Sequence, residues 1–160
     1  MIVRIKNCIF KIIYILVVLY LIIFIPTIWG QKPLVIISGS MEPTLKVGGI
    51  LYYHEKNYSD FKKDDILVFK LNDHNISHRV YEVTGDGIIT KGDANKSYDE
   101  ILITEDRILG EGTNWCIPFI GYYADFIYRN KYLLVISIIV IIIDMAFDKK
   151  KKEVLDEKNT

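Results

Sequence analysis

The stretch VYEVTGDGIITK, residues 80–91, indicates the fold class of this 160-residue chain. Its two flanks are rich in β-branched residues and Gly85-Asp86-Gly87 is a turn signal, so we expect a β-hairpin between Val80–Thr84 and Ile88–Lys91. Similar apolar runs occur at residues 34–37, 50–53 and 66–69, separated by turn signals at residues 48–49, 57–60 and 72–75. Residues 101–109 have no clear assignment. Residues 30–131 therefore predict a mostly β domain.

An uncharged block, IIYILVVLYLIIFIPTIW, occupies residues 12–29. As a helix rising about 1.5 Å per residue it spans about 27 Å, close to the thickness of a hydrocarbon core. Lys11 can reach the headgroups at one end, and Trp29 can lie in the interface at the other. A cleavable signal peptide is the rival interpretation, but no Ala-x-Ala site follows the block. We expect a retained transmembrane helix.

A second apolar block at residues 132–147 is weaker, because its uninterrupted part, Leu133–Ile143, is short and Asp144 follows it. An acid is tolerated near a headgroup boundary, so a second transmembrane helix is expected. A buried helix of a soluble domain is the alternative.

Positive charge orients both blocks. Arg4, Lys6 and Lys11 precede the first block, and four lysines at 149–152 follow the second, so both ends are expected in the cytoplasm. The predicted order is a cytoplasmic N-terminus (1–11), a transmembrane helix (12–29), an extracytoplasmic β domain (30–131), a second transmembrane helix (132–147) and a cytoplasmic Lys-rich tail (148–160). The protein is thus expected to be multi-pass in the cell membrane.

Overall composition excludes some classes of function. The chain has 20 basic and 20 acidic residues, so its formal net charge is zero and nucleic acid is not an expected partner. The two cysteines, Cys8 and Cys116, form neither a CxxC pair nor a disulfide framework.

The first candidate catalytic group is a serine hydroxyl that could act as a nucleophile. Ser40 lies in Ser38-Gly39-Ser40-Met41-Glu42-Pro43-Thr44, directly after an apolar run. Gly39 frees the backbone before Ser40 and Pro43 stiffens the exit, so one point of the chain can present a hydroxyl and a backbone N–H. A nucleophilic hydrolase needs both, together with a base. From the residues alone, an ordinary turn is the competing interpretation.

Three histidines are candidate bases. His54 and His74 are expected to be exposed, whereas His78 opens a strand, a rigid position from which to aim an imidazole. The His74-x-x-x-His78 spacing resembles half of a zinc site, but no third ligand cluster accompanies it, so no metal is expected. An orienting carboxylate could come from Asp93 or Asp99, and the residues alone do not choose between them.

Taken together, these motifs resemble the type I signal peptidases over nearly the whole chain. After the serine motif come Asp64-Asp65-Ile66-Leu67-Val68-Phe69, Ser77-His78-Arg79-Val80 and Thr90-Lys91-Gly92-Asp93-Ala94-Asn95 in the family's order. The usual bacterial enzymes carry a lysine base where this chain has His78. The resemblance is therefore to the endoplasmic-reticulum type, found in eukaryotes, archaea and some Gram-positive bacteria, whose fold is a mostly β catalytic domain.

The resemblance implies a role for each residue. Ser40 matches the nucleophile, His78 the general base and Asp99 the acid of a Ser-His-Asp triad, while Asp93 belongs to the supporting Gly-Asp box. The N–H of Ser40 and the hydroxyl of Ser38 match the oxyanion donors. No cofactor is implied. Two positions depart from the family pattern, because this chain has Gly48-Gly49 where Gly-Asp is frequent and Asp64 where glycine is frequent.

The implied activity is removal of N-terminal signal peptides from exported preproteins by a membrane-bound serine endopeptidase that cleaves after small residues. The implied partners are secretory preproteins, the lipid bilayer and the Sec translocon. Two alternatives remain open: a dedicated peptidase for a few biofilm, spore or pilin precursors, and a catalytically inactive membrane-anchored accessory module.

Overall fold

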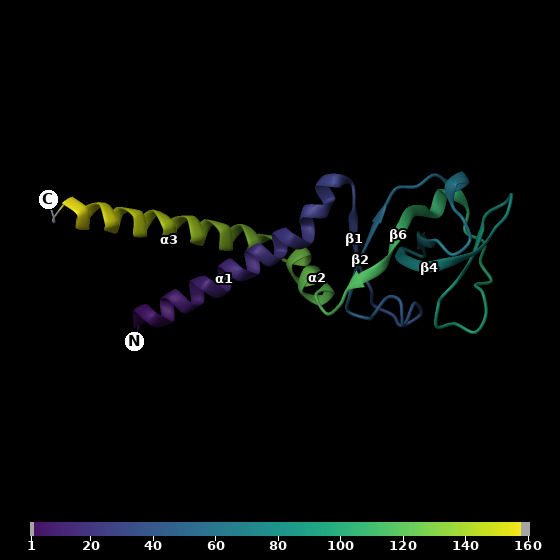
Figure 1. Cartoon of the computed structure of the whole chain (residues 1–160), viewed down its shortest axis with the longest axis horizontal. Coiled ribbons are helices and arrows are strands. Elements are labelled where there is room, and N and C mark those ends of the chain that lie inside the picture. The colour runs from purple at the N-terminus through teal and green to yellow at the C-terminus, as the bar shows by residue number, and fades with distance from the viewer. Residues whose placement is uncertain (1, 158–160) are drawn as a thin grey trace. The chain divides into compact units, whose positions relative to one another are not determined.

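The computed structural model describes residues 2–157, so Met1 and the last three residues of the predicted tail (148–160) lie outside the described residues. Contacts divide the chain into two units. The helical unit comprises Met1–Ile23 and Phe126–Thr160, and the β unit comprises Phe24–Asp125. Figure 1 shows the long helices α1 and α3 of the helical unit and the strands of the β unit.

The first apolar block is helical but not one uniform helix. Helix α1 spans Ile2–Phe24, and a 3-10 helix, η1, follows at Ile25–Trp29. Pro26 lies at the start of η1 and has no N–H, so it cannot continue the α-helical bonding. The predicted helix at 12–29 therefore changes type after Phe24. Cys8–Trp29 is long and apolar enough to cross a membrane. Among the described helices it is the only unbent segment that meets both conditions.

The second apolar block also lies in a helix. Helix α2 spans Gly121–Arg129, and helix α3 spans Lys131–Glu157, so α3 contains the whole block and continues into the lysine-rich tail. The block meets the length and composition of a span only when α2 and residues 131–147 are taken together, and these are bent by 88° at the break between them. A helix at 132–147 is present, and its passage through a membrane stays a prediction.

The β unit contains a six-stranded antiparallel sheet, which confirms the expected mostly β domain. The strand order is β1-β2-β6-β3-β4-β5. The bounds are Lys32–Val35 for β1, Ile50–His54 for β2, Ile66–Leu71 for β3, His74–Val83 for β4, Ile88–Lys91 for β5 and Ile108–Ile117 for β6. Short 3-10 turns lie at Tyr58–Asp60 (η2) and Glu105–Arg107 (η3). The predicted Gly85–Gly87 turn joins β4 to β5.

Strand β4 is longer than the sequence indicated. The predicted turn at 72–75 is only two residues long, because Asn72 and Asp73 adopt positive φ angles of 48° and 62° and His74 already pairs with Leu71. This is the turn geometry that matches the twist of a hairpin, and Asn and Asp tolerate it. As a consequence His78 lies in the middle of β4, opposite Leu67, and does not open a strand.

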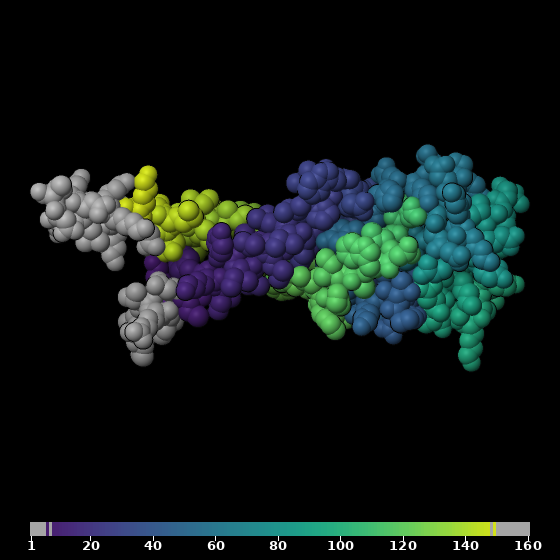
Figure 2. Space-filling view, viewed as in Figure 1, coloured from purple at the N-terminus to yellow at the C-terminus, as the bar shows by residue number. Residues whose placement is uncertain are grey.

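Strand β6 lies between β2 and β3 and was not predicted over most of its length. Gly110 makes the close approach of β2 possible, since a Cβ there would overlap the carbonyl oxygen of His54. Figure 2 shows the light green chain segment that includes the end of β6 at the surface of the β unit. Trp115, near the end of this strand, is exposed.

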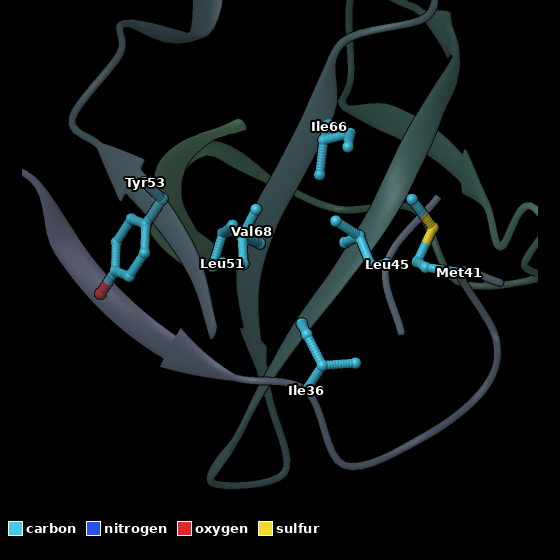
Figure 3. Close-up of a cluster of buried hydrophobic side chains, with 7 residues drawn as sticks. All are labelled: Ile36, Met41, Leu45, Leu51, Tyr53, Ile66 and Val68. Carbon is cyan, nitrogen blue, oxygen red and sulfur yellow. The ribbon is translucent and has the colours of Figure 1, made fainter. Parts of the chain in front are cut away.

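Both faces of the central strand β3 are buried. Ile66 and Val68 belong to one apolar cluster, and Leu67 and Phe69 to another on the opposite face. Figure 3 shows the first cluster, to which β strands and the serine-bearing loop contribute: Ile36, Met41, Leu45, Leu51, Tyr53, Ile66 and Val68. The core of the β unit therefore includes Met41, directly after Ser40, and Ile36, four residues before it.

Candidate active site

The loop that carries Ser40 is anchored to the core by the residues that follow the serine. Met41 is 1% exposed and Leu45 is fully buried, so the residue next to the serine cannot move without opening the apolar cluster. The N–H of Glu42 donates to the carbonyl of Gly39, which closes a tight turn around Ser40. The buried neighbours hold the backbone, and the hydroxyl of Ser40 is left to face the site.

His78 lies directly beside this hydroxyl. Its Nε2 is 3.0 Å from Ser40 Oγ, and its ring packs edge-on against Phe69 with centroids 6.3 Å apart. The side chain is 12% exposed. Because β4 is paired with β3 at this residue, the imidazole is aimed from a rigid element.

Asp99 completes a chain of hydrogen bonds. Its Oδ2 lies 2.6 Å from His78 Nδ1. A carboxylate only accepts hydrogen bonds, so the ring proton belongs on Nδ1, and Nε2 is the acceptor for the Ser40 hydroxyl. Ser40, His78 and Asp99 thus have the geometric relation that a serine hydrolase requires of its nucleophile, base and orienting acid.

Asp93, the other candidate acid, is engaged elsewhere. Arg79 donates from Nε to Oδ1 and from Nη2 to Oδ2, each at 2.7 Å, and Thr44 donates to Oδ2 at 2.6 Å. The Arg79 guanidinium, through these hydrogen bonds, lowers the pKa of the Asp93 carboxyl below its usual value. The structure therefore gives the two acids different partners: Asp99 contacts the histidine, and Asp93 joins β4 to the loop after Ser40.

The loop around Asp93 also touches the serine backbone. The N–H of Ala94 donates to the Ser40 carbonyl at 2.9 Å. A Cβ at Gly92 would lie 2.6 Å from that same carbonyl oxygen, so this approach requires glycine. The Gly-Asp box thus fixes the position of Ser40 from behind.

Ser38 lies on the other side of the nucleophile, with its Oγ 3.3 Å from Ser40 Oγ. A hydroxyl there can donate to an oxygen that develops negative charge near Ser40. The two remaining histidines are not part of the hydrogen-bond chain. His54 ends β2, 3.8 Å from Glu111, and His74 begins β4. In the described part of the chain, no three His, Cys, Asp or Glu side chains are grouped to hold a metal ion.

A cavity of about 140 Å³ lies next to Ser40. Residues 34–38 with Ser40 and Met41 line one side, and residues 74–77 line the other, so its walls come from the end of β1 and the start of β4. His74, expected to be solvated, is exposed and also borders this cavity. The cavity is small and mostly apolar in its residues, which suits a small side chain.

Sequence reasoning did not single out three residues that support the site. Arg79 and Thr90 lie inside quoted motifs, next to His78 and the Gly-Asp box, and Thr44 ends the serine motif. Their partners come from distant parts of the chain, and an exposed-looking Arg or Thr carries no signal of such a contact. Thr90 donates to Asp99 Oδ2 at 2.6 Å.

Comparison with known proteins shows the family to which the chain belongs. The family model described as signal peptidase, peptidase S26, matches residues 9–107. The chain belongs to this family. It is similar to "Signal peptidase I W" of Bacillus subtilis, with 26% identity over 129 residues, 71% of this chain and 67% of that protein.

Two fungal proteins named "Signal peptidase complex catalytic subunit SEC11" are also similar. The protein from Colletotrichum graminicola is 34% identical over 102 residues, 55% of this chain and 59% of its own length. The protein from Lachancea thermotolerans is 31% identical over 119 residues, 64% of this chain and 70% of its own. The match therefore covers about three fifths to seven tenths of the length of these relatives.

Proposed function

We propose that this protein is a membrane-bound serine endopeptidase that removes N-terminal signal peptides from exported preproteins. The observation that carries the proposal is the continuous hydrogen-bond chain from Ser40 through His78 to Asp99, at 3.0 and 2.6 Å. The names of the relatives, signal peptidases of a bacterium and of fungi, supply the substrate class.

The mechanism follows from the positions of the protons. His78 Nε2 takes the proton of Ser40 as Oγ attacks the carbonyl carbon of the scissile peptide bond. Asp99 stabilises the imidazolium that forms. The same proton then passes to the leaving amine, and the signal peptide is left as an ester on Ser40. Water, deprotonated by His78, attacks this ester, and the released serine regains its proton.

Negative charge develops on the carbonyl oxygen of the scissile bond during attack, and hydrogen-bond donors are needed to stabilise it. The N–H of Ser40 and the hydroxyl of Ser38 serve this purpose in the proposal, since Ser38 Oγ lies 3.3 Å from the nucleophile.

Two unpaired strand edges support binding of the substrate as an extended chain. β1 is the terminal strand of the sheet, and within the described strands β5 pairs with β4 only at Arg79–Val83, which leaves the start of β4 without a neighbour on that side. Both edges border the cavity beside Ser40. A peptide lying between them would satisfy backbone groups on each side.

The size of the cavity supports cleavage after small residues. In an extended peptide alternate side chains point the same way, so the first and third residues before the cut would face the same wall. A cavity of about 140 Å³ accommodates residues of the size of alanine at these places and excludes large aromatic ones.

The membrane arrangement is part of the proposal. α1 and residues 132–147 of α3 are two spans, residues 30–131 lie on the extracytoplasmic side, and both chain ends are cytoplasmic. Lys6 Nζ lies 2.7 Å from Asp144 Oδ1, so the one acid of the second apolar block has a cationic partner near the N-terminus. Pairing reduces the cost of holding an acid close to the hydrocarbon.

Proximity to the bilayer suits the substrate. About ten residues separate Trp29 from Ser40, so at about 3.5 Å per residue Ser40 lies within about 35 Å of the interface where Trp29 is expected. A signal peptide is cut soon after its apolar part leaves the bilayer. Delivery of preproteins by the Sec translocon fits this position, and His78 in place of lysine fits the endoplasmic-reticulum type.

The test is cleavage of a labelled preprotein by the purified protein in detergent, with the new N-terminus identified by mass spectrometry. We expect one cut after a small residue, and no cut when that residue is replaced by tryptophan. Uncut preprotein, or cuts scattered along an unfolded chain irrespective of this residue, would refute the proposed function.

A further inference from the structure

Thr90 is a fully buried polar residue beside the candidate triad. It lies in β5, opposite Val80 of β4, and its hydroxyl donates to Asp99 Oδ2 at 2.6 Å. Its carbonyl oxygen accepts the N–H of Asp99 at 2.7 Å. One strand residue therefore holds Asp99 through both its backbone and its side chain.

Asp99 needs such an anchor, because it lies in the loop that follows β5 and belongs to no strand. Rotation about the bonds of its side chain would turn the carboxylate away from the imidazole. The oxygen held by Thr90 is the same Oδ2 that faces His78 Nδ1, so two donors approach one oxygen, each at 2.6 Å. Two donors from two neighbouring strands fix the direction of that oxygen.

The buried location makes this contact worth more than an exposed hydrogen bond. Water does not reach the Thr90 hydroxyl, so removal of the hydroxyl leaves no substitute donor for the carboxylate. Valine has nearly the same shape as threonine, and loss of the donor can therefore be separated from loss of packing.

We propose that Thr90 is a positioning residue of the peptidase, acting through Asp99 to keep His78 in the tautomer and direction that deprotonate Ser40. This inference rests on the proposed function. It predicts that the hydroxyl of Thr90 affects the chemical step and not the binding of substrate, because Thr90 is buried behind the acid and away from the cavity that borders Ser40.

Kinetics of preprotein cleavage give the first test. Thr90→Val should lower kcat about tenfold with KM changed less than about twofold, and Thr90→Ser, which keeps the donor, should stay within about threefold of the parent. In an Asp99→Ala background Thr90→Val should add no further loss. If Thr90→Val does not fold, the pair Thr90→Ser and Thr90→Cys replaces it, because the thiol is a weak donor of similar size.

A second readout does not require activity. The chain has three histidines, so nitrogen-15 labelling of histidine gives few signals, and His54→Gln and His74→Gln assign those of His78. A proton held between Nδ1 and a carboxylate resonates far downfield. We expect this resonance to move upfield in Thr90→Val and to be retained in Thr90→Ser.

Equal kcat and an unchanged His78 resonance in Thr90→Val would overturn the inference, as would equal losses in the serine and valine variants. A protein that cleaves no preprotein refutes the proposed function instead, and the resonance then still reports whether Thr90 positions Asp99.

Discussion

Arg79 and Asp93 form a bidentate ion pair in which two hydrogen bonds, each 2.7 Å long, join the guanidinium to the two carboxylate oxygens. Arg79 follows His78 in β4, and Asp93 follows Gly92, whose loop contacts the Ser40 backbone. The pair thus connects the strand of the base to the loop that supports the nucleophile. Its geometry is the bidentate one that makes Arg–carboxylate pairs strong.

Removal of this pair should destabilise the β unit. Asp93→Asn keeps the size of the side chain but leaves Arg79, which is about one quarter exposed, without its charge partner. We expect the free energy of unfolding at neutral pH to fall by about 1–3 kcal/mol, less than for a fully buried pair because of partial exposure. Denaturant unfolding in detergent measures this. Equal stability of the two proteins would contradict it.

The same pair predicts an acid-sensitive stability. Arg79 lowers the pKa of Asp93 in the folded state, so the carboxylate stabilises the fold fully above its unfolded pKa, near 4, and this contribution is lost as pH falls through the lower, folded value. Between neutral pH and about pH 4, the difference between wild type and Asp93→Asn should stay constant, and below that it should shrink. A difference that grows on acidification would show the opposite sign.

Gly92→Ala should impair catalysis through the serine backbone. The added Cβ would lie 2.6 Å from the Ser40 carbonyl oxygen and 2.8 Å from the Asn95 amide, so the loop must shift. We expect kcat for preprotein cleavage to fall at least about tenfold. Gly85→Ala is the matched control, because no atom lies within 4 Å of a Cβ there and activity should be retained. Similar rates for the two variants would disprove this account of Gly92.

Replacement of Asp64 by glycine should stabilise the protein. Asp64 has a φ of 75°, in the left-handed region that disfavours residues with a Cβ. Asp64→Gly should raise the free energy of unfolding by about 0.5 kcal/mol. Asp64→Val should lower it by at least about 1 kcal/mol. Lys63→Gly serves as control and should be destabilising. A less stable Asp64→Gly protein would refute the backbone argument.

The effects of substituting Lys6 and Asp144 on stability should be coupled. Lys6→Met leaves Asp144 without this cation and should lower the thermal midpoint in detergent, and Asp144→Leu removes the carboxylate that Lys6 contacts. The double variant should recover most of the loss, because no lone charge remains. We expect a coupling free energy of about 1 kcal/mol. Strictly additive changes would mean that the two side chains do not pair.

Local patterns were sufficient for much of the fold. The β4–β5 hairpin has a glycine turn between β-branched runs, and the apolar run at β3 is buried on both faces. These features depend on neighbours in the sequence, so they could be predicted. Strand β6 could not, because Gly110 and Gly112 resemble turn residues until β2 and β3 are placed on either side.

In the candidate site, too, some features could be predicted from the sequence and others depend on contacts between distant residues. The resemblance pointed to Ser40, His78 and Asp99, and the structure brings these side chains together, although their catalytic roles remain predictions. The residues alone could not separate Asp93 from Asp99. That choice depends on Arg79 and on the buried Thr90, whose contacts arise only when β4 and β5 pair.

Ser40, His78 and Asp99 are proposed to act as one catalytic unit. The direct measurement is kcat/KM for preprotein cleavage in Ser40→Ala, His78→Gln, Asp99→Asn and the triple variant, with folding checked by thermal unfolding. We expect Ser40→Ala and His78→Gln each to lose at least about a thousandfold and the triple variant to lose little more, since members of one unit are not additive. Cleavage that survives Ser40→Ala, or losses that multiply across the variants, would contradict the central claim.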